Sequence, residues 1–102
     1  METWKIKELQ TIAQEIVDDA NENGKKYDLF FHDAHNVYVD CCYDADYTPV
    51  EYYPDAGYVG GDLCRLELYN IDGCWVDEEG NETDLTDEEE QMLQDEVNRL
   101  IY

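Results

Sequence analysis

The chain has few basic residues. Six Lys and Arg oppose 27 Asp and Glu in 102 residues, so the formal net charge is −21, whereas a small domain usually carries a magnitude of about 2 to 8. From Tyr27 onward only Arg65 and Arg99 oppose 21 carboxylates. Such a surface repels DNA, RNA and anionic lipid, so we expect no direct binding to nucleic acid or membranes. The other four basic residues lie in the first 26 positions: Lys5, Lys7, Lys25 and Lys26.

Long hydrophobic runs are also missing, and we expect no secretion leader. No stretch approaches the roughly 20 apolar residues of a membrane helix, and the segment 1–5 does not join basic residues to an apolar run as a signal peptide does. A secreted disulfide scaffold is usually shorter and richer in loops. We therefore expect a cytoplasmic protein with reduced thiols that pack as small hydrophobes: Cys41, Cys42, Cys64 and Cys74.

Acidity of this degree is typical of disordered chains, but those chains lack aromatic residues. This one has nine Tyr, two Trp and two Phe, and 43% of its residues are hydrophobic. Its length is that of one domain with one core. We predict a single folded domain over residues 1–102.

Two helices are predicted at the ends of the chain. Apolar residues recur at three-and-four spacing from Ile6 to Ala20, with Thr3 as the expected N-cap and Gly24 as the C-terminal stop. A second helix follows Thr86, because Glu89 lies three residues further on, which is the spacing of a capping box. Its expected buried side chains are Met92, Leu93, Val97, Leu100 and Ile101.

Strands are predicted between the helices. Residues 27–32 and 37–42 alternate with period two around the turn 33–36 and so indicate a hairpin. Residues 44–62 contain both prolines and three glycines, which indicates a long loop with a short edge strand at 50–53. Residues 63–71 and 74–76 are expected to pair across an Asp72-Gly73 turn. The turn 77–81 then leads to a short strand that ends near Leu85.

This order predicts an α+β fold, with an N-terminal helix, an antiparallel meander of four to five strands and a C-terminal helix. Both helices should cover one face of the sheet. The other face should carry tyrosines and acidic residues.

The carboxylates and cysteines match no standard metal or catalytic motif. With Gly80 as the loop glycine, the calcium-ligand positions of an EF-hand hold Trp75, Asp77, Glu79 and Thr86, so the motif fails. His32, His35, Cys41 and Cys42 lack the paired spacing of a zinc site. A cysteine nucleophile is disfavoured on so acidic a surface, and a small meander offers little cleft for a carboxylate-pair hydrolase. We expect no enzyme, cofactor or dedicated metal site.

The carboxylates of residues 87–90 complement the positive end of a helix dipole, but no dipole stabilises the many acids on strands, turns and the loop. Tyrosines in the loop lie among acids, and this combination suits a surface rich in Arg and Lys. We therefore expect partner contacts from Asp44, Asp46, Glu51, Tyr52, Tyr53, Asp55, Asp77, Glu78, Glu79, Glu82, Asp84, Asp87 and Glu88.

In size, charge and mixed α/β pattern, the whole chain resembles the acidic DNA-mimic proteins of phages and mobile elements, such as anti-restriction proteins and anti-CRISPR inhibitors. The resemblance implies a non-enzymatic inhibitor that occupies the nucleic-acid channel of a basic protein, for example a nuclease, as a monomer or homodimer. The alternative is a small acidic accessory or structural protein whose charge serves solubility or salt adaptation.

Overall fold

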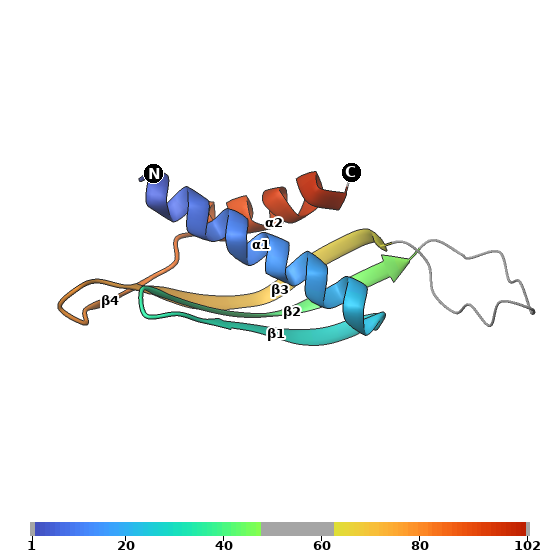
Figure 1. Ribbon diagram of the computed structural model, residues 1–102, viewed down its shortest axis with the longest axis horizontal. Helices are drawn as coiled ribbons and strands as arrows, with labels where there is room; N and C mark the ends of the chain where they lie inside the picture. Colours follow the sequence, from blue (N-terminus) through green and yellow to red (C-terminus); the bar gives the residue numbers. More distant parts are fainter. Residues whose placement is uncertain (1, 48–62, 102) are drawn as a thin grey trace, which may run out of the picture.

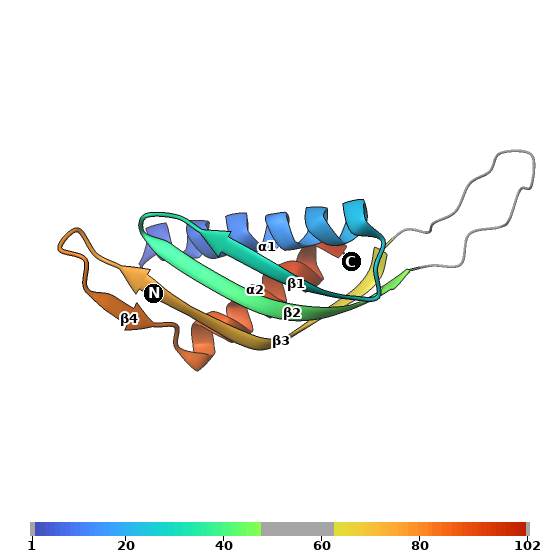
Figure 2. The same cartoon turned by 90° about the horizontal axis from the view of Figure 1, so that it is seen from below.

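The computed structural model describes residues 2–47 and 63–101 and has the predicted α+β order (Figure 1). The sheet has the strand order β1-β2-β3-β4, and every neighbouring pair is antiparallel. Both helices lie on one face of it, and the view from below shows the strands in front of both helices (Figure 2). The elements are α1 (Thr3–Asn23), β1 (Tyr27–Asp33), β2 (Val37–Tyr47), β3 (Leu63–Val76), β4 (Glu82–Asp84) and α2 (Asp87–Ile101).

The core lies between the two helices and the covered face of the sheet. Along β2 every second side chain points into it, which fixes the phase of the strand because a shift by one residue would expose the whole set. The buried side chains are Leu9, Ile12, Ala13, Ile16, Val17 and Ala20 of α1, Leu93 and Val97 of α2, and Phe30, Val37, Val39, Cys41, Tyr43, Ala45, Leu66, Leu68 and Trp75 of the sheet.

Two of the three predicted helix caps are confirmed. Gly24 closes α1 in the left-handed conformation with φ of 63°, and its N–H donates to Ala20 O at 3.0 Å. Thr86 and Glu89 form the predicted capping box. The expectation that Thr3 is an N-cap is wrong, because Thr3 is already helical and Glu2 precedes the helix without a side-chain cap.

The predicted turn at Asp72-Gly73 is wrong, because β3 runs unbroken through both residues to Val76. A Cβ atom on Gly73 would lie 2.5 Å from Tyr38 O on β2, so glycine is needed for close approach of two backbones and not for a reversal of the chain. The irregularity of β3 lies earlier. Asn70 has φ of 52°, and the register with β2 shifts by one residue between Asp40 and Cys42, as at a β-bulge.

The expected loop start at residue 44 is also wrong, because β2 continues to Tyr47. The Tyr47 hydroxyl donates to Ala20 O at 2.7 Å and so ties the end of β2 to α1. The turn 77–81 and the short strand β4 are as predicted. The proposed edge strand at 50–53 lies outside the described residues, as do Glu51, Tyr52, Tyr53 and Asp55.

Candidate partner-binding surfaces

Six of the predicted contact residues gather where β3 turns into β4 and α2 begins. All six are exposed, and none makes an ion pair or a side-chain hydrogen bond within residues 2–47 and 63–101. The β3–β4 turn forms one end of the described fold (Figure 1). We refer to this group as the acidic end; it consists of Glu78, Glu79, Glu82, Asp84, Asp87 and Glu88.

Asp77 lies beside the acidic end but serves the turn. Its Oδ1 accepts hydrogen bonds from the backbone N–H groups of Glu79 and Asn81 at 2.9 and 2.8 Å, and its Oδ2 accepts from Asn81 Nδ2 at 3.1 Å. The hydrogen bonds from Asn81 are the main reason that the pKa of Asp77 lies below its ordinary value. The carboxylate therefore shapes the turn and has little capacity left for a partner.

Glu89 is a buried carboxylate that sequence reasoning treated only as a cap. Its side chain accepts a hydrogen bond from Trp75 Nε1 at 2.8 Å and another from Thr86 N–H at 2.8 Å. Trp75 in turn packs edge-on against Trp4, with ring centres 5.3 Å apart. Glu89 thus joins the start of α2 to β3 and does not contribute to the acidic surface.

Asp44 and Asp46 lie at the other end of the sheet and are paired with the chain's own cations. Arg65 Nε lies 2.6 Å from Asp46 Oδ2, and Arg65 Nη2 lies 3.1 Å from Asp44 Oδ1. Lys26 Nζ lies 3.1 Å from Asp46 Oδ1. The hydrogen bond from Arg65, followed by that from Lys26, lowers the pKa of Asp46. These two carboxylates are separated from the acidic end by on the order of 30 Å along β3, so the structure does not unite the predicted contact residues.

The face of the sheet that no helix covers carries a second candidate surface. Residues that are directly opposite on antiparallel strands share a face, so the register arranges the outward side chains in rows across β1, β2 and β3. The rows are Tyr27–Asp44–Glu67, Leu29–Cys42–Tyr69 and Phe31–Asp40–Asp72.

Large apolar side chains on this face are exposed. Tyr27 and Leu29 are each 58% exposed, Phe31 is 64% exposed and Tyr69 is 42% exposed. These four residues and Cys42 are called the open-face patch below. The predicted face of tyrosines and acids is present, but sequence reasoning missed Leu29 and Phe31. Phe30 lies between Leu29 and Phe31 in β1, so the sequence does not show which of these side chains point into the core. The pairing of β1 with β2 shows that Phe30 is buried and that Leu29 and Phe31 are exposed.

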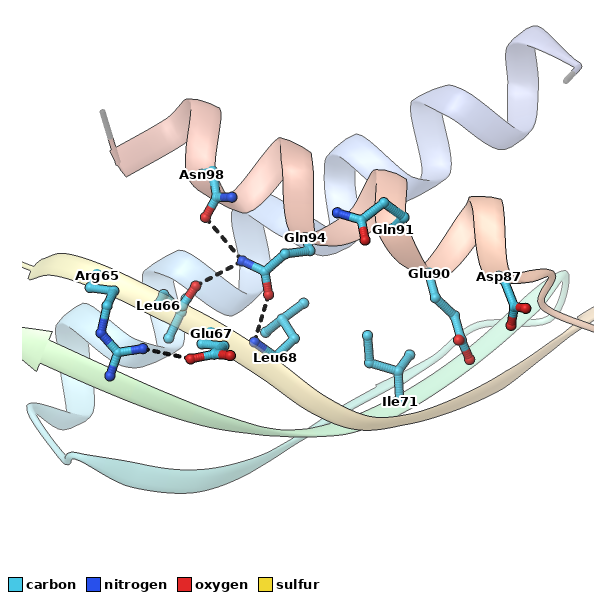
Figure 3. Close-up of a pocket in the computed structure, with 10 residues that line it drawn as sticks. All are labelled: Arg65, Leu66, Glu67, Leu68, Ile71, Asp87, Glu90, Gln91, Gln94 and Asn98. Atoms are coloured by element: carbon cyan, nitrogen blue, oxygen red, sulfur yellow. Dashed lines mark hydrogen bonds and ion pairs between the residues drawn. The ribbon is translucent and has the colours of Figure 1, made fainter.

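A groove of about 670 Å³ lies between α2 and β3 (Figure 3). Gln94 crosses it, accepting a hydrogen bond from Leu68 N–H at 2.7 Å and donating to Leu66 O at 2.9 Å. Its amide thereby satisfies backbone groups of β3 as a neighbouring strand would. The lining side chains have no Ser, Cys or His that could act as a nucleophile or base; they are Arg65, Leu66, Glu67, Leu68, Ile71, Asp87, Glu90, Gln91, Gln94 and Asn98.

The residues considered for zinc do not converge in the structure. His32 Nδ1 lies 2.5 Å from Glu15 Oε2 on α1, while Cys41 points into the core, where burial raises its pKa to about 12. Cys42 lies on the opposite face of the same strand. Within residues 2–47 and 63–101, no group of three or more His, Cys, Asp or Glu side chains is placed to hold a metal ion.

In the described part of the chain, neither helix has the length and apolar character needed to cross a membrane. The chain matches no protein-family model, no curated protein and no solved structure.

Proposed function

We propose that this protein is a non-enzymatic acidic binding protein that mimics nucleic acid and inhibits a basic nucleic-acid-binding partner, such as a nuclease, in the cytoplasm. The observation that carries the proposal is the acidic end, where six exposed carboxylates have no cation partner within the described residues. Three of the chain's six cations are paired elsewhere: Lys26 and Arg65 with acids at the far end of the sheet, and Arg99 with Glu96.

The physical basis is the competition between two anionic surfaces for one set of Lys and Arg side chains. A nucleic-acid-binding protein gains most of its non-specific affinity from neutralising closely spaced phosphates. Carboxylates on a turn, a strand and a helix start can accept charge-assisted hydrogen bonds from a partner, and because their backbone is already folded only the side chains must be ordered. Unpaired carboxylates are the useful ones, since a carboxylate already held by Arg65 must first give up that contact.

A competition experiment tests the proposal. Labelled DNA is bound to a basic nuclease or repressor encoded beside this gene, and the protein is added at up to micromolar concentration. We expect release of the DNA, and release should weaken as salt rises because both anions are screened. If DNA is not displaced from any such protein, the mimic proposal is wrong.

Two variants that remove equal charge locate the contact. The quadruple variant Glu78→Gln, Glu79→Gln, Glu82→Gln, Asp84→Asn should compete about tenfold less well or worse. The control changes four exposed acids on the helices: Glu15→Gln, Asp18→Asn, Glu22→Gln and Asp95→Asn. Equal losses in both variants would show that total charge matters and that the acidic end has no special role.

The alternative role in solubility or salt adaptation is favoured by a different observation. Exposed acids also occur on α1 at Glu15, Asp18 and Glu22, and on α2 at Asp95. Charge is therefore not limited to one binding surface. The response of stability to salt separates the two functions.

A further inference from the structure

The outward positions of β1 are unusual for a sheet face in contact with water. An antiparallel sheet with one covered face normally has polar side chains on the other, yet β1 presents Tyr27, Leu29 and Phe31 there. Of the five large hydrophobic side chains that are exposed within residues 2–47 and 63–101, four belong to the open-face patch. Clustered exposed apolar side chains typically mark a surface that another molecule covers.

Carboxylates flank the patch on both sides. The Leu29–Cys42–Tyr69 row lies between the Asp44–Glu67 pair and the Asp40–Asp72 pair. Consecutive rows are two residues apart along β1 and β2, which is about 7 Å, while the bulge places Tyr69 and Asp72 three residues apart on β3. A side chain of Lys or Arg on a molecule that covers the apolar row can therefore reach Asp40 and Asp72, whereas Asp44 and Glu67 on the other side are already paired with Arg65.

The Asp40–Asp72 pair has no cation of its own. The two residues are directly opposite on β2 and β3, and within the described residues neither makes an ion pair. Asp40 accepts a hydrogen bond from the Tyr38 hydroxyl at 2.8 Å. Like charges that face each other across two strands destabilise a sheet, so a cation supplied by a partner would relieve a repulsion that the free chain retains.

Charge complementarity selects the occupant. A second copy of this chain would place its own carboxylate rows against these, and each copy carries a net charge of −21. A basic segment with exposed apolar or aromatic side chains matches both parts of the surface. Aromatic and aliphatic contacts surrounded by charged contacts are the usual composition of an interface core and its rim.

We propose that the open-face patch docks an apolar and basic protein segment, whose hydrophobic side chains cover Leu29, Phe31 and Tyr69 and whose Lys or Arg side chains pair with Asp40 and Asp72. The inference rests on the proposed function for the basic character of the partner. The open-face patch would be a second contact surface. The affinity of this surface for the partner would depend on burial of apolar side chains as well as on charge.

Two short peptides of equal length and equal positive charge test the inference on the full chain. In one, Lys alternates with Leu and Phe; in the other, Lys alternates with Ser. We expect the apolar peptide to bind about tenfold more tightly by fluorescence anisotropy. It should also shift the backbone amide NMR signals of Leu29, Phe31, Cys42 and Tyr69.

The double variant Leu29→Ser, Phe31→Ser should remove this preference while leaving the affinity for the Lys–Ser peptide unchanged. Both side chains are more than half exposed, so the variant should fold, and a thermal melt checks this. Trp4→Ser is the control, because among residues 2–47 and 63–101 Trp4 is the exposed large hydrophobic residue outside the patch, at 44%, and this change should preserve the preference.

Three results would overturn the inference: equal affinity for both peptides, amide shifts confined to the acidic end, or a concentration-dependent dimer that the double variant abolishes. The last result would identify a second copy as the occupant. The outcome is independent of the DNA competition. Peptide preference without DNA displacement retains the docking surface and rejects mimicry, whereas displacement without preference means that charge alone is recognised.

Discussion

At the scale of single residues, Glu89 is the carboxylate whose removal should cost most stability. It is 4% exposed and accepts hydrogen bonds from Trp75 Nε1 and Thr86 N–H. Glu89→Ala leaves the buried indole N–H unpaired, which costs about 1–3 kcal/mol, and removes half of the capping box, which costs about 1 kcal/mol. We expect the free energy of unfolding, measured with urea, to fall by about 2–4 kcal/mol.

Glu88→Ala is the matched control, because Glu88 is the preceding residue of the same helical turn and is exposed without a partner in the described part of the chain. Its unfolding free energy should stay within about 0.5 kcal/mol of the parent. If both variants lose the same amount, the indole contact of Glu89 contributes nothing beyond the charge at the helix start.

The sequence shows the local contacts of these carboxylates but not the distant ones. The Thr86-to-Glu89 spacing predicts the capping box because both partners lie within one helical turn. The bond from Trp75 to Glu89 spans 14 positions and depends on how α2 packs on β3. The ion pairs of Asp44 and Asp46 with Arg65 depend on the register of two strands. Partner-binding and structural carboxylates therefore look alike until the fold is known.

At the scale of elements, the continuity of β3 depends on Gly73. A Cβ there would lie 2.5 Å from Tyr38 O and 2.9 Å from Leu85 Cδ1, so the backbones of β2 and β3 must separate to admit it. We expect Gly73→Ala to lower the free energy of unfolding by about 1–3 kcal/mol, as overpacking does. Amide hydrogen exchange should also accelerate at Tyr38 and Cys74, which pair across the two strands.

Asp72→Asn provides the control one residue away. It removes one charge of the Asp40–Asp72 pair and adds no bulk to the interior, so stability should remain the same or rise by about 0.2–1 kcal/mol. If Gly73→Ala proves as mild as Asp72→Asn, residue 73 is not closely packed against β2.

The turn wrongly predicted at Asp72-Gly73 and the loop start wrongly predicted at residue 44 have a common physical cause, which is the long pairing of β2 with β3. Asp-Gly is a strong local signal for a hairpin turn, but β2 is eleven residues long and pairs with β3 over most of its length. Tertiary pairing therefore overrides the local preference. The phase of β1 follows the same rule, since Phe30 is buried only because β1 pairs with β2 in the register that the core imposes.

At the scale of the whole molecule, composition predicts the net charge and hydrophobic periodicity predicts the α+β order, but neither shows which side chains lie on the open face of the sheet or which carboxylates are unpaired. The acidic end is contiguous in sequence, from Glu78 to Glu88, so inspection of the sequence finds it. The open-face patch joins residues from three strands and requires the register. The net charge of the molecule, through its response to salt, can decide between the two candidate functions.

A binding protein and a salt-adapted protein should differ in how folding responds to ionic strength. Screening is weak at 0.01 M salt, where the Debye length is about 30 Å, and strong at 1 M, where it is about 3 Å. A charge of −21 must self-repel at low salt, but here the core formed by two helices and the sheet opposes that repulsion. We therefore expect a cooperative thermal melt, followed by circular dichroism, even at 0.01 M, with a midpoint that rises by a few degrees toward 1 M.

The quadruple variant of the acidic end supplies the internal check on this prediction. Because it removes four of the 27 acidic charges, its melting midpoint should depend less on salt than that of the parent chain. Over the same range of salt, the affinity of the parent for its basic partner should fall, because salt weakens binding between opposite charges. The stability of the parent should rise over this range. A parent chain that is largely unfolded at 0.01 M and folds only as salt is added would instead favour salt adaptation. In that case the chain would fold only where salt screens the repulsion among its carboxylates.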